Sequence, residues 1–151
     1  MKKLLLSIIT ASVLSACGST YEWENVTHEQ FKKTNAPSLS ELQAMAERNV
    51  RDTLKDPEGA QVRFISKPTV NYRTIDGGPK TLVWGFCLEV NAKNGYGALT
   101  GFKKYFNTID AQGRGSVYSP GTPDTHRCVV DSEGRQINKG TGEILNGGDF
   151  Y

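Results

Sequence analysis

The stretch 81-TLVWGFCLEVNAK-93 has the longest alternation of apolar and other residues in the chain. Successive side chains of a β-strand point to opposite faces, so this pattern predicts a central strand with one dry face and one mixed face. The predicted dry face carries Leu82, Trp84, Phe86, Leu88, Val90 and Ala92, and the mixed face carries Val83, Gly85, Cys87, Glu89, Asn91 and Lys93.

Asn94-Gly95 follows this strand directly and is typical of a type I′ hairpin turn, because both residues accept positive φ. A two-residue turn would place Gly101 opposite Leu88, whereas a bulge at Gly97 or Gly101 would exchange the faces of the next strand. The register of the hairpin therefore stays open. Further alternating stretches predict strands at 60–66, 69–75, 99–110 and 115–119, and at 127–137 with a turn at 132–134.

A helix is predicted from Ser38 to Asp56. Ser38 and Glu41 have the spacing of a capping box, apolar residues recur every three or four positions after them, and Pro57 disfavours helical geometry at Asp56. The sequence thus predicts an α+β fold with one disulfide, in which one N-terminal amphipathic helix packs on a mainly antiparallel curved sheet of about five strands.

Residues 1–16 have the order of a secretory signal peptide. Lys2 and Lys3 precede an apolar run, and the small residues Ser15 and Ala16 end it. The run is shorter than the roughly 20 residues that a membrane-spanning helix needs. We therefore expect residues 1–16 to be cleaved from the protein.

The last four residues of this region, Leu14-Ser15-Ala16-Cys17, resemble the lipobox of bacterial lipoproteins. The resemblance implies cleavage before Cys17, a diacylglycerol on its thiol and a membrane anchor. Gly18, standing where aspartate would favour inner-membrane retention, implies the outer membrane of the cell envelope, facing the periplasm. An ordinary signal peptide with a coincidental cysteine is the alternative.

After the leader, the sequence predicts three segments. Residues 17–37 lack a sustained period and are predicted to be a lipid-anchored tether, residues 38–137 form the α+β domain, and the glycine-rich residues 138–151 form a flexible tail.

Cys87 and Cys128 are expected to form a disulfide, because an exported chain enters an oxidising compartment. The alternative makes Cys87 a nucleophile with His28 or His126 as its base. An alternating apolar segment is a poor setting for a reactive thiol, which favours the disulfide.

The segment "EVNAKNGYGALTGF" gathers polar and aromatic residues around the predicted turn. Residues 55–107 resemble a group of small uncharacterised bacterial and phage-borne envelope proteins, a resemblance that implies no activity. The candidate binding patch comprises Glu89, Asn91, Lys93, Asn94, Tyr96 and Phe102. The alternative is that Glu89 and Lys93 pair with neighbours across the sheet while Asn94 makes the turn.

Composition and motifs exclude several classes of function. The 18 Lys and Arg face 16 Asp and Glu, and loss of Lys2 and Lys3 balances them, so we expect no nucleic-acid partner. Thr100 breaks a dinucleotide-binding glycine pattern, and we predict no cofactor, no metal site and no catalytic residues. Asp124 and His126 lie in a loop without a nucleophile elbow, so an enzyme is the less favoured class.

These observations predict a lipoprotein that is anchored in the membrane by its N-terminal lipid. We expect it to act as a non-enzymatic binding or accessory module for a protein or cell-wall partner. The alternatives are a phage- or plasmid-type exclusion or inhibitor lipoprotein, and a small envelope hydrolase.

Overall fold

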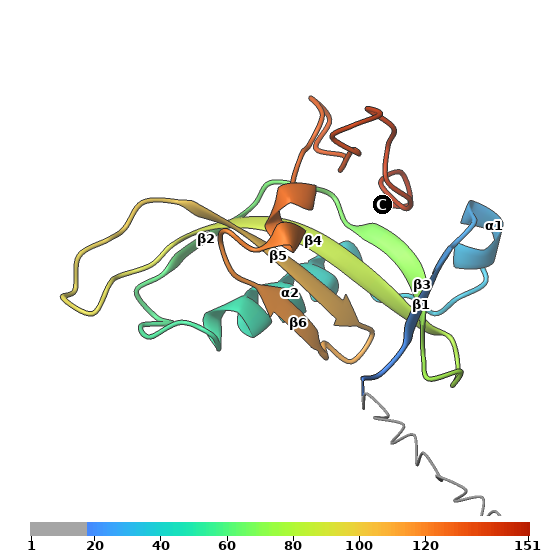
Figure 1. Cartoon of the computed structure of the whole chain (residues 1–151), viewed down its shortest axis with the longest axis horizontal. Coiled ribbons are helices and arrows are strands. Elements are labelled where there is room, and N and C mark those ends of the chain that lie inside the picture. The colour runs from blue at the N-terminus through green and yellow to red at the C-terminus, as the bar shows by residue number, and fades with distance from the viewer. Residues whose placement is uncertain (1–17) are drawn as a thin grey trace, which may run out of the picture.

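An antiparallel sheet of six strands forms the body of the molecule in the computed structural model, which describes residues 18–151 (Figure 1). The strand order is β1-β3-β4-β5-β6, and β2 pairs with β4 beside β3. The strands are β1 (Tyr21–Asn25), β2 (Gln61–Phe64), β3 (Thr69–Ile75), β4 (Thr81–Asn91), β5 (Lys103–Asp110) and β6 (Gly115–Tyr118). One long helix lies on this sheet, so the predicted α+β fold is confirmed. The predicted leader and Cys17 lie outside the described residues, within which no helix is long and apolar enough to cross a membrane.

β4 is the central strand, as its alternation predicts, because it pairs with β2, β3 and β5. Its dry face is completely buried at Trp84, Phe86 and Leu88. The apolar stripe of helix α2 (Leu39–Arg51) covers this face with Leu42, Ala46 and Val50. Burial of these side chains between helix and sheet is the main hydrophobic stabilisation of the fold.

The capping box at the start of α2 is present. The backbone N–H of Ser38 donates to Glu41 Oε2 over 2.8 Å, and Glu41 N–H donates back to Ser38 Oγ over 3.4 Å. The helix ends at Arg51, so the predicted end at Asp56 is wrong. The hydroxyl of Thr53 donates to the carbonyl of Val50 over 2.7 Å, and such a local bond competes with continuation of the helix.

The β4–β5 hairpin forms, but its turn is longer than two residues. Asn94 N–H bonds to the carbonyl of Ala98, and Gly97 has a φ of +84°. A bulge at Gly101, which has a φ of +82°, then shifts the pairing so that Leu88 faces Tyr105. The expected tight turn at Asn94-Gly95 is therefore wrong, and the bulge at Gly101 sets the register.

Residues 18–37 are not the predicted unstructured tether, because β1 adds to the sheet edge beside β3. Helix α1 (His28–Phe31) follows, capped by Thr27 and Gln30. Val26 between them is 1 % exposed and belongs to the core.

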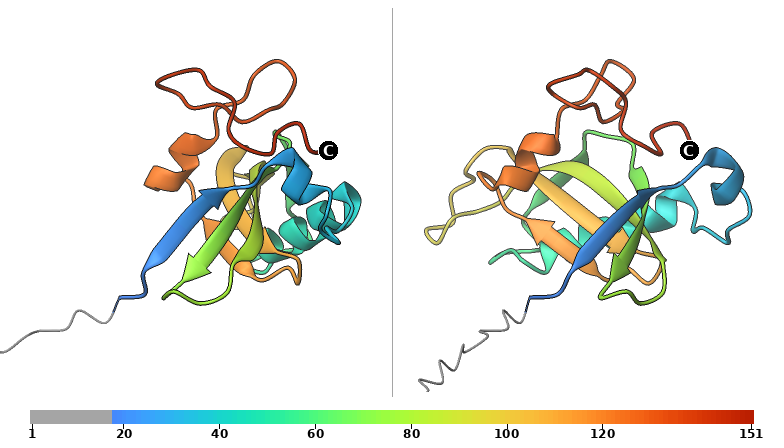
Figure 2. Two further views of the ribbon diagram at one scale, coloured as in Figure 1. Left: turned by 90° about the vertical axis from the view of Figure 1, so that its right-hand side faces the viewer. Right: turned by 45° about the vertical axis from the view of Figure 1, so that its right-hand side comes forward.

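The C-terminal residues are also not a flexible tail. The ring of Phe150 stacks on that of Phe31 with centroids 4.8 Å apart, and the hydroxyl of Tyr151 bonds to both Trp84 and the carbonyl of Pro37. Figures 1 and 2 show the C-terminus beside the α1 region. The C-terminus is held because it packs against α1 and the core, a long-range contact that composition does not report.

The turn predicted at 132–134 forms, but the strand predicted at 127–137 is wrong, because only isolated bridges occur there, between Val130 and Gln136 and between Ile137 and Ile144. This segment follows the short 3₁₀ helix η1 (Pro123–Arg127) and crosses the mixed face of the sheet, with Gln136 buried against it. The left panel of Figure 2 shows α2 and η1 on opposite sides of the sheet.

Candidate ligand pocket

A pocket of about 540 Å³ lies on the face of the sheet opposite α2. Its size is within the range of small-molecule sites. The sheet supplies its floor through Thr69, Asn71, Val83, Gly85, Phe106 and Thr108, while η1 and the C-terminal segment rise beside it. Val83 and Gly85, at the start of the predicted mixed face of β4, are thus part of the floor of the cavity.

The absence of a side chain at Gly85 makes room for its neighbours. A Cβ at this position would lie 2.6 Å from Thr69 Oγ1 and 2.9 Å from Phe106 Cζ. Thr69 and Thr108 are buried, at 6 % and 7 % exposure, and the hydroxyl of Thr69 donates to the carbonyl of Gly85 over 3.4 Å. This part of the pocket is dense, polar and uncharged.

Aromatic rings flank the pocket on two sides. Trp23 projects from the edge strand β1 and is 54 % exposed. Phe106 and Tyr118 form a pair across β5 and β6, with ring centroids 5.9 Å apart. Phe106 is buried, at 6 % exposure, whereas a half-exposed ring such as Trp23 presents flat apolar surface to a ligand or a partner.

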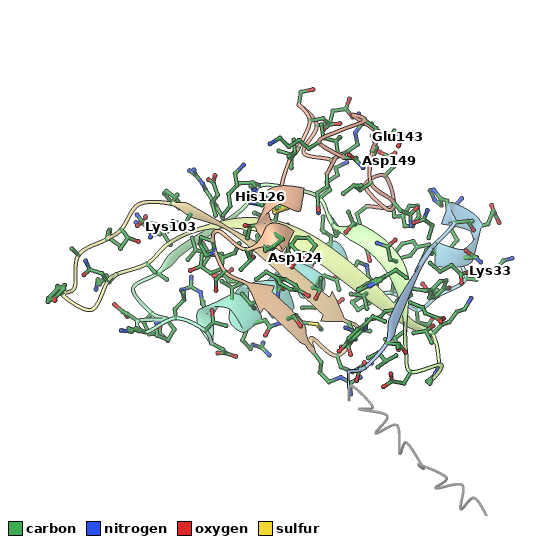
Figure 3. The ribbon with its side chains drawn as sticks, viewed as in Figure 1. Lys33, Lys103, Asp124, His126, Glu143 and Asp149 are labelled. Atoms are coloured by element: carbon green, nitrogen blue, oxygen red, sulfur yellow. A yellow bond between two sulfur atoms is a disulfide. The ribbon has the colours of Figure 1, made fainter. Side chains whose placement is uncertain are left out.

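The disulfide between Cys87 and Cys128 is present, as predicted, and it ties the end of η1 to the middle of β4. Figure 3 shows the two labelled η1 residues, Asp124 and His126, in front of the sheet. Both line the pocket. The disulfide therefore fixes η1 in place. Among the described lining of the pocket, η1 is the only element that contributes both a carboxylate and an imidazole.

The C-terminal wall is held by two amide side chains. Gln136 is 1 % exposed, and its Nε2 lies 2.7 Å from the carbonyl of Gly85 and 3.0 Å from Ser66 Oγ. Asn146 bonds to both backbone groups of Val70, where the pairing of β1 with β3 has ended. The wall is thus bonded to the sheet at Gly85 on β4 and at Val70 on β3.

The predicted binding patch lies on the same face but beyond the disulfide. Glu89 Oε2 accepts from Arg63 Nε over 2.8 Å, and Lys93 lies 3.1 Å from Asp56. The backbone N–H of Gly59 and the ammonium of Lys93 lower the pKa of Asp56 below its usual value. These two predicted patch residues therefore have ionic partners within the chain.

The remaining patch residues shape the hairpin. Asn91 Oδ1 accepts from the bulge residue Gly101, and Asn94 Oδ1 accepts from the N–H of Tyr96 over 2.9 Å. Phe102 lies under the guanidinium of Arg63 at 3.9 Å. Tyr96 is 97 % exposed at the tip. The structure does not bring the six residues together as one site, although Tyr96 and Phe102 remain open to a partner.

Cys87 is not a free nucleophile, because its sulfur is bonded to Cys128. The two histidines considered as its base have different surroundings. His28 contacts the ring of Phe150, and His126 lines the pocket. Within residues 18–151, no three His, Cys, Asp or Glu side chains are grouped so that they could hold a metal ion.

Comparison with known proteins gives no match: no family model fits the chain, and no curated protein or solved structure is significantly similar to it.

Sequence reasoning missed most of the pocket, including Trp23, Asn25, Asn71, Thr108 and Asn146. One signal was present. In the stretch 69-TVNYRTI-75 the residues on either side of Val70, Thr69 and Asn71, are uncharged and polar, although Arg73 continues the same face. Uncharged polar residues are unusual on a strand face exposed to solvent, where charged residues prevail, and they are also unusual on a face buried in a core.

Proposed function

We propose that this chain is a lipid-anchored protein of the cell envelope, carried on the outer membrane and facing the periplasm, that acts as a non-enzymatic binding module. The observation that carries the binding role is the pocket, whose lining is dominated by aromatic rings, amides and hydroxyls rather than by a nucleophile with its base. These groups recognise a ligand by stacking and hydrogen bonding.

The start of the domain is consistent with an anchor at Cys17. Residues 18–20 alone separate Cys17 from β1, so an extended connection holds the first strand within roughly 15 Å of a lipidated cysteine. At that end Tyr21 pairs with Ile75, and they are 57 % and 40 % exposed. Tyrosine is enriched at the membrane–water interface, which favours an orientation with this end toward the bilayer.

A bond between the N-terminal segment and the β3–β4 turn makes this end rigid. Asp76 Oδ1 accepts from the backbone N–H of Thr20 over 2.7 Å, and this bond lowers the pKa of the Asp76 carboxyl. The folded body is therefore expected to sit close to the membrane rather than at the end of a long tether.

Mass spectrometry of the full chain, expressed in a Gram-negative host and extracted from its envelope, tests the anchor. We expect a chain that begins at Cys17 and carries diacylglycerol and an amide-linked acyl chain, while Cys17→Ser keeps its leader or is found unlipidated. An unmodified soluble wild-type chain, or cleavage at another bond, would refute the anchoring.

A second candidate function is the exclusion or inhibitor lipoprotein. It is favoured by the β4–β5 hairpin, which extends beyond the sheet in Figure 1 and carries Tyr96, Leu99 and Phe102, each at least 41 % exposed. This function predicts that cells expressing the protein resist one phage or conjugating donor and that Tyr96→Ala removes the resistance.

A further inference from the structure

The charge of the pocket argues against an ionic ligand. Within the described residues, the lining side chains that carry a carboxylate, an imidazole or an ammonium are Asp124, His126 and Lys139. One carboxylate, one imidazole and one ammonium on the walls do not make the cluster of cations that a phosphate or nucleotide needs. The floor between them is uncharged.

The floor argues against an apolar ligand. The side chains of Asn71 and Thr108 line the cavity, and the neighbouring bonds from Thr69 to Gly85 and from Asn107 to Ser116 do not involve them. A lipid tail or other hydrocarbon in the pocket would cover these groups without pairing them, at a cost of about 1–3 kcal/mol for each group. A ligand with several hydroxyl or amide groups would pair them instead.

The aromatic rings set a second requirement for the ligand, which must also have a flat apolar face. Trp23 on β1 and Tyr118 on β6 stand on opposite edges of the sheet, with the polar floor between them. A sugar ring has hydroxyls around its equator and C–H groups on its faces, so it can stack on an aromatic ring while its edge bonds to amides and hydroxyls. A peptide strand is a poorer fit, because the floor is the paired face of the sheet and not a free edge.

We infer that the pocket binds a short neutral glycan, with Trp23 as a stacking platform and Asn71 and Thr108 as hydrogen-bonding groups on the floor. This inference rests on the binding role proposed above but not on the lipid anchor. It names the chemical class of the ligand, which for an envelope protein includes the glycan of the cell wall.

Titration of the full chain with triacetylchitotriose and with cellotriose tests the inference. Calorimetry is expected to give saturable binding of at least one of them. The chain has two tryptophans, of which Trp84 is completely buried, so a change in tryptophan emission on binding reports chiefly on Trp23. Inorganic phosphate and decanoate serve as the anionic and apolar probes, and both are expected to bind more weakly.

Substitutions assign the binding to this pocket. Trp23→Ala and Thr108→Val are each expected to weaken glycan binding about ten-fold or more, which is the effect of losing one contact worth about 1.4 kcal/mol. The matched controls are Tyr21→Ala, on the same strand as Trp23 and outside the lining, and Thr74→Val on β3. Both controls are expected to bind like the wild type.

Asn25→Ala is a further variant, because Asn25 is an exposed lining residue whose loss leaves the core intact. It keeps the test decisive if Thr108→Val unfolds, and it is expected to weaken binding as well. The inference is overturned if neither glycan binds, if the lining variants bind as the controls do, or if phosphate or decanoate binds more tightly. If a lipidated chain does not bind a glycan, this inference is refuted and the proposed anchor stands. If an unlipidated chain binds a glycan, this inference stands and the anchor is refuted.

Discussion

Tyr151→Phe removes a single oxygen atom from the last residue of the chain. That oxygen accepts from the indole N–H of Trp84 over 3.1 Å and donates to the carbonyl of Pro37 over 3.1 Å. It therefore joins the C-terminus, the central strand β4 and the residue before α2 at one point.

The loss of stability in Tyr151→Phe follows from the burial of the Trp84 indole. Trp84 is completely buried, so its N–H has no access to water once the phenol is gone, and an unpaired buried donor costs about 1–3 kcal/mol. The Pro37 carbonyl is nearer the surface and can be rehydrated, so its loss adds little. We expect the free energy of unfolding to fall by about 2 kcal/mol, which for a domain of this size lowers Tm by roughly 7 °C.

Urea unfolding followed by circular dichroism measures this change. Tyr96→Phe is the matched control, because that hydroxyl is on a side chain 97 % exposed at the hairpin tip, and we expect a change within about 0.5 kcal/mol. If Tyr151→Phe is as stable as this control, the C-terminus does not dock on the core, and residues 138–151 are the loose tail that composition predicts.

Three further changes in stability are expected. Replacing Cys87 and Cys128 together by alanine frees a loop with a sequence separation of 41 and is expected to lower the free energy of unfolding by about 4 kcal/mol in urea, whereas an unchanged midpoint would contradict the bridge. Gly115→Ala places a Cβ 1.6 Å from a backbone oxygen of β5 and is expected to cost at least about 2 kcal/mol in thermal melts, so a wild-type Tm would show that β6 is paired differently. Burial raises the pKa of Tyr105 and of Tyr151, so stability is expected to be constant below pH of about 10 and to fall above it, because these phenols ionise first in the unfolded chain; a flat titration to high pH would refute their burial.

The parts of the fold that sequence predicts are those with a strong local period. The alternation in β4 and the capping box at Ser38 each specify an element from neighbouring residues, and the structure places both as expected. The failures are at segments whose order comes from distant partners. Phe31 is an isolated aromatic in polar sequence, and its contacts with the rings of Phe150 and Tyr151, together with the bond from Trp84 to Tyr151, make α1 and the C-terminus part of the domain.

The candidate site was harder to predict for the same reason. The polar cluster around Asn94 is dense in sequence, but its bonds serve the turn and the bulge, since local polar groups satisfy local backbone groups first. The pocket draws one or two residues from each strand other than β2 and from η1, and more from the C-terminal segment at 136–146, so no window of sequence contains more than a fragment of it. Only the pairing order of the strands brings those fragments together.

The two faces of β4 have different roles, since one stabilises the fold and the other lines the pocket. On the α2 side Trp84, Phe86 and Leu88 are packed without polar partners apart from the indole N–H, and this face supplies the hydrophobic free energy of the fold. The opposite face begins with Gly85, where a side chain would fill the pocket, and continues with Cys87, whose disulfide fixes η1 as a wall. Through this disulfide Cys87 and Cys128 pack with Phe106 in a small second apolar cluster on this face. The disulfide and this small cluster together hold η1 beside the pocket, while the larger apolar core lies on the α2 side of β4.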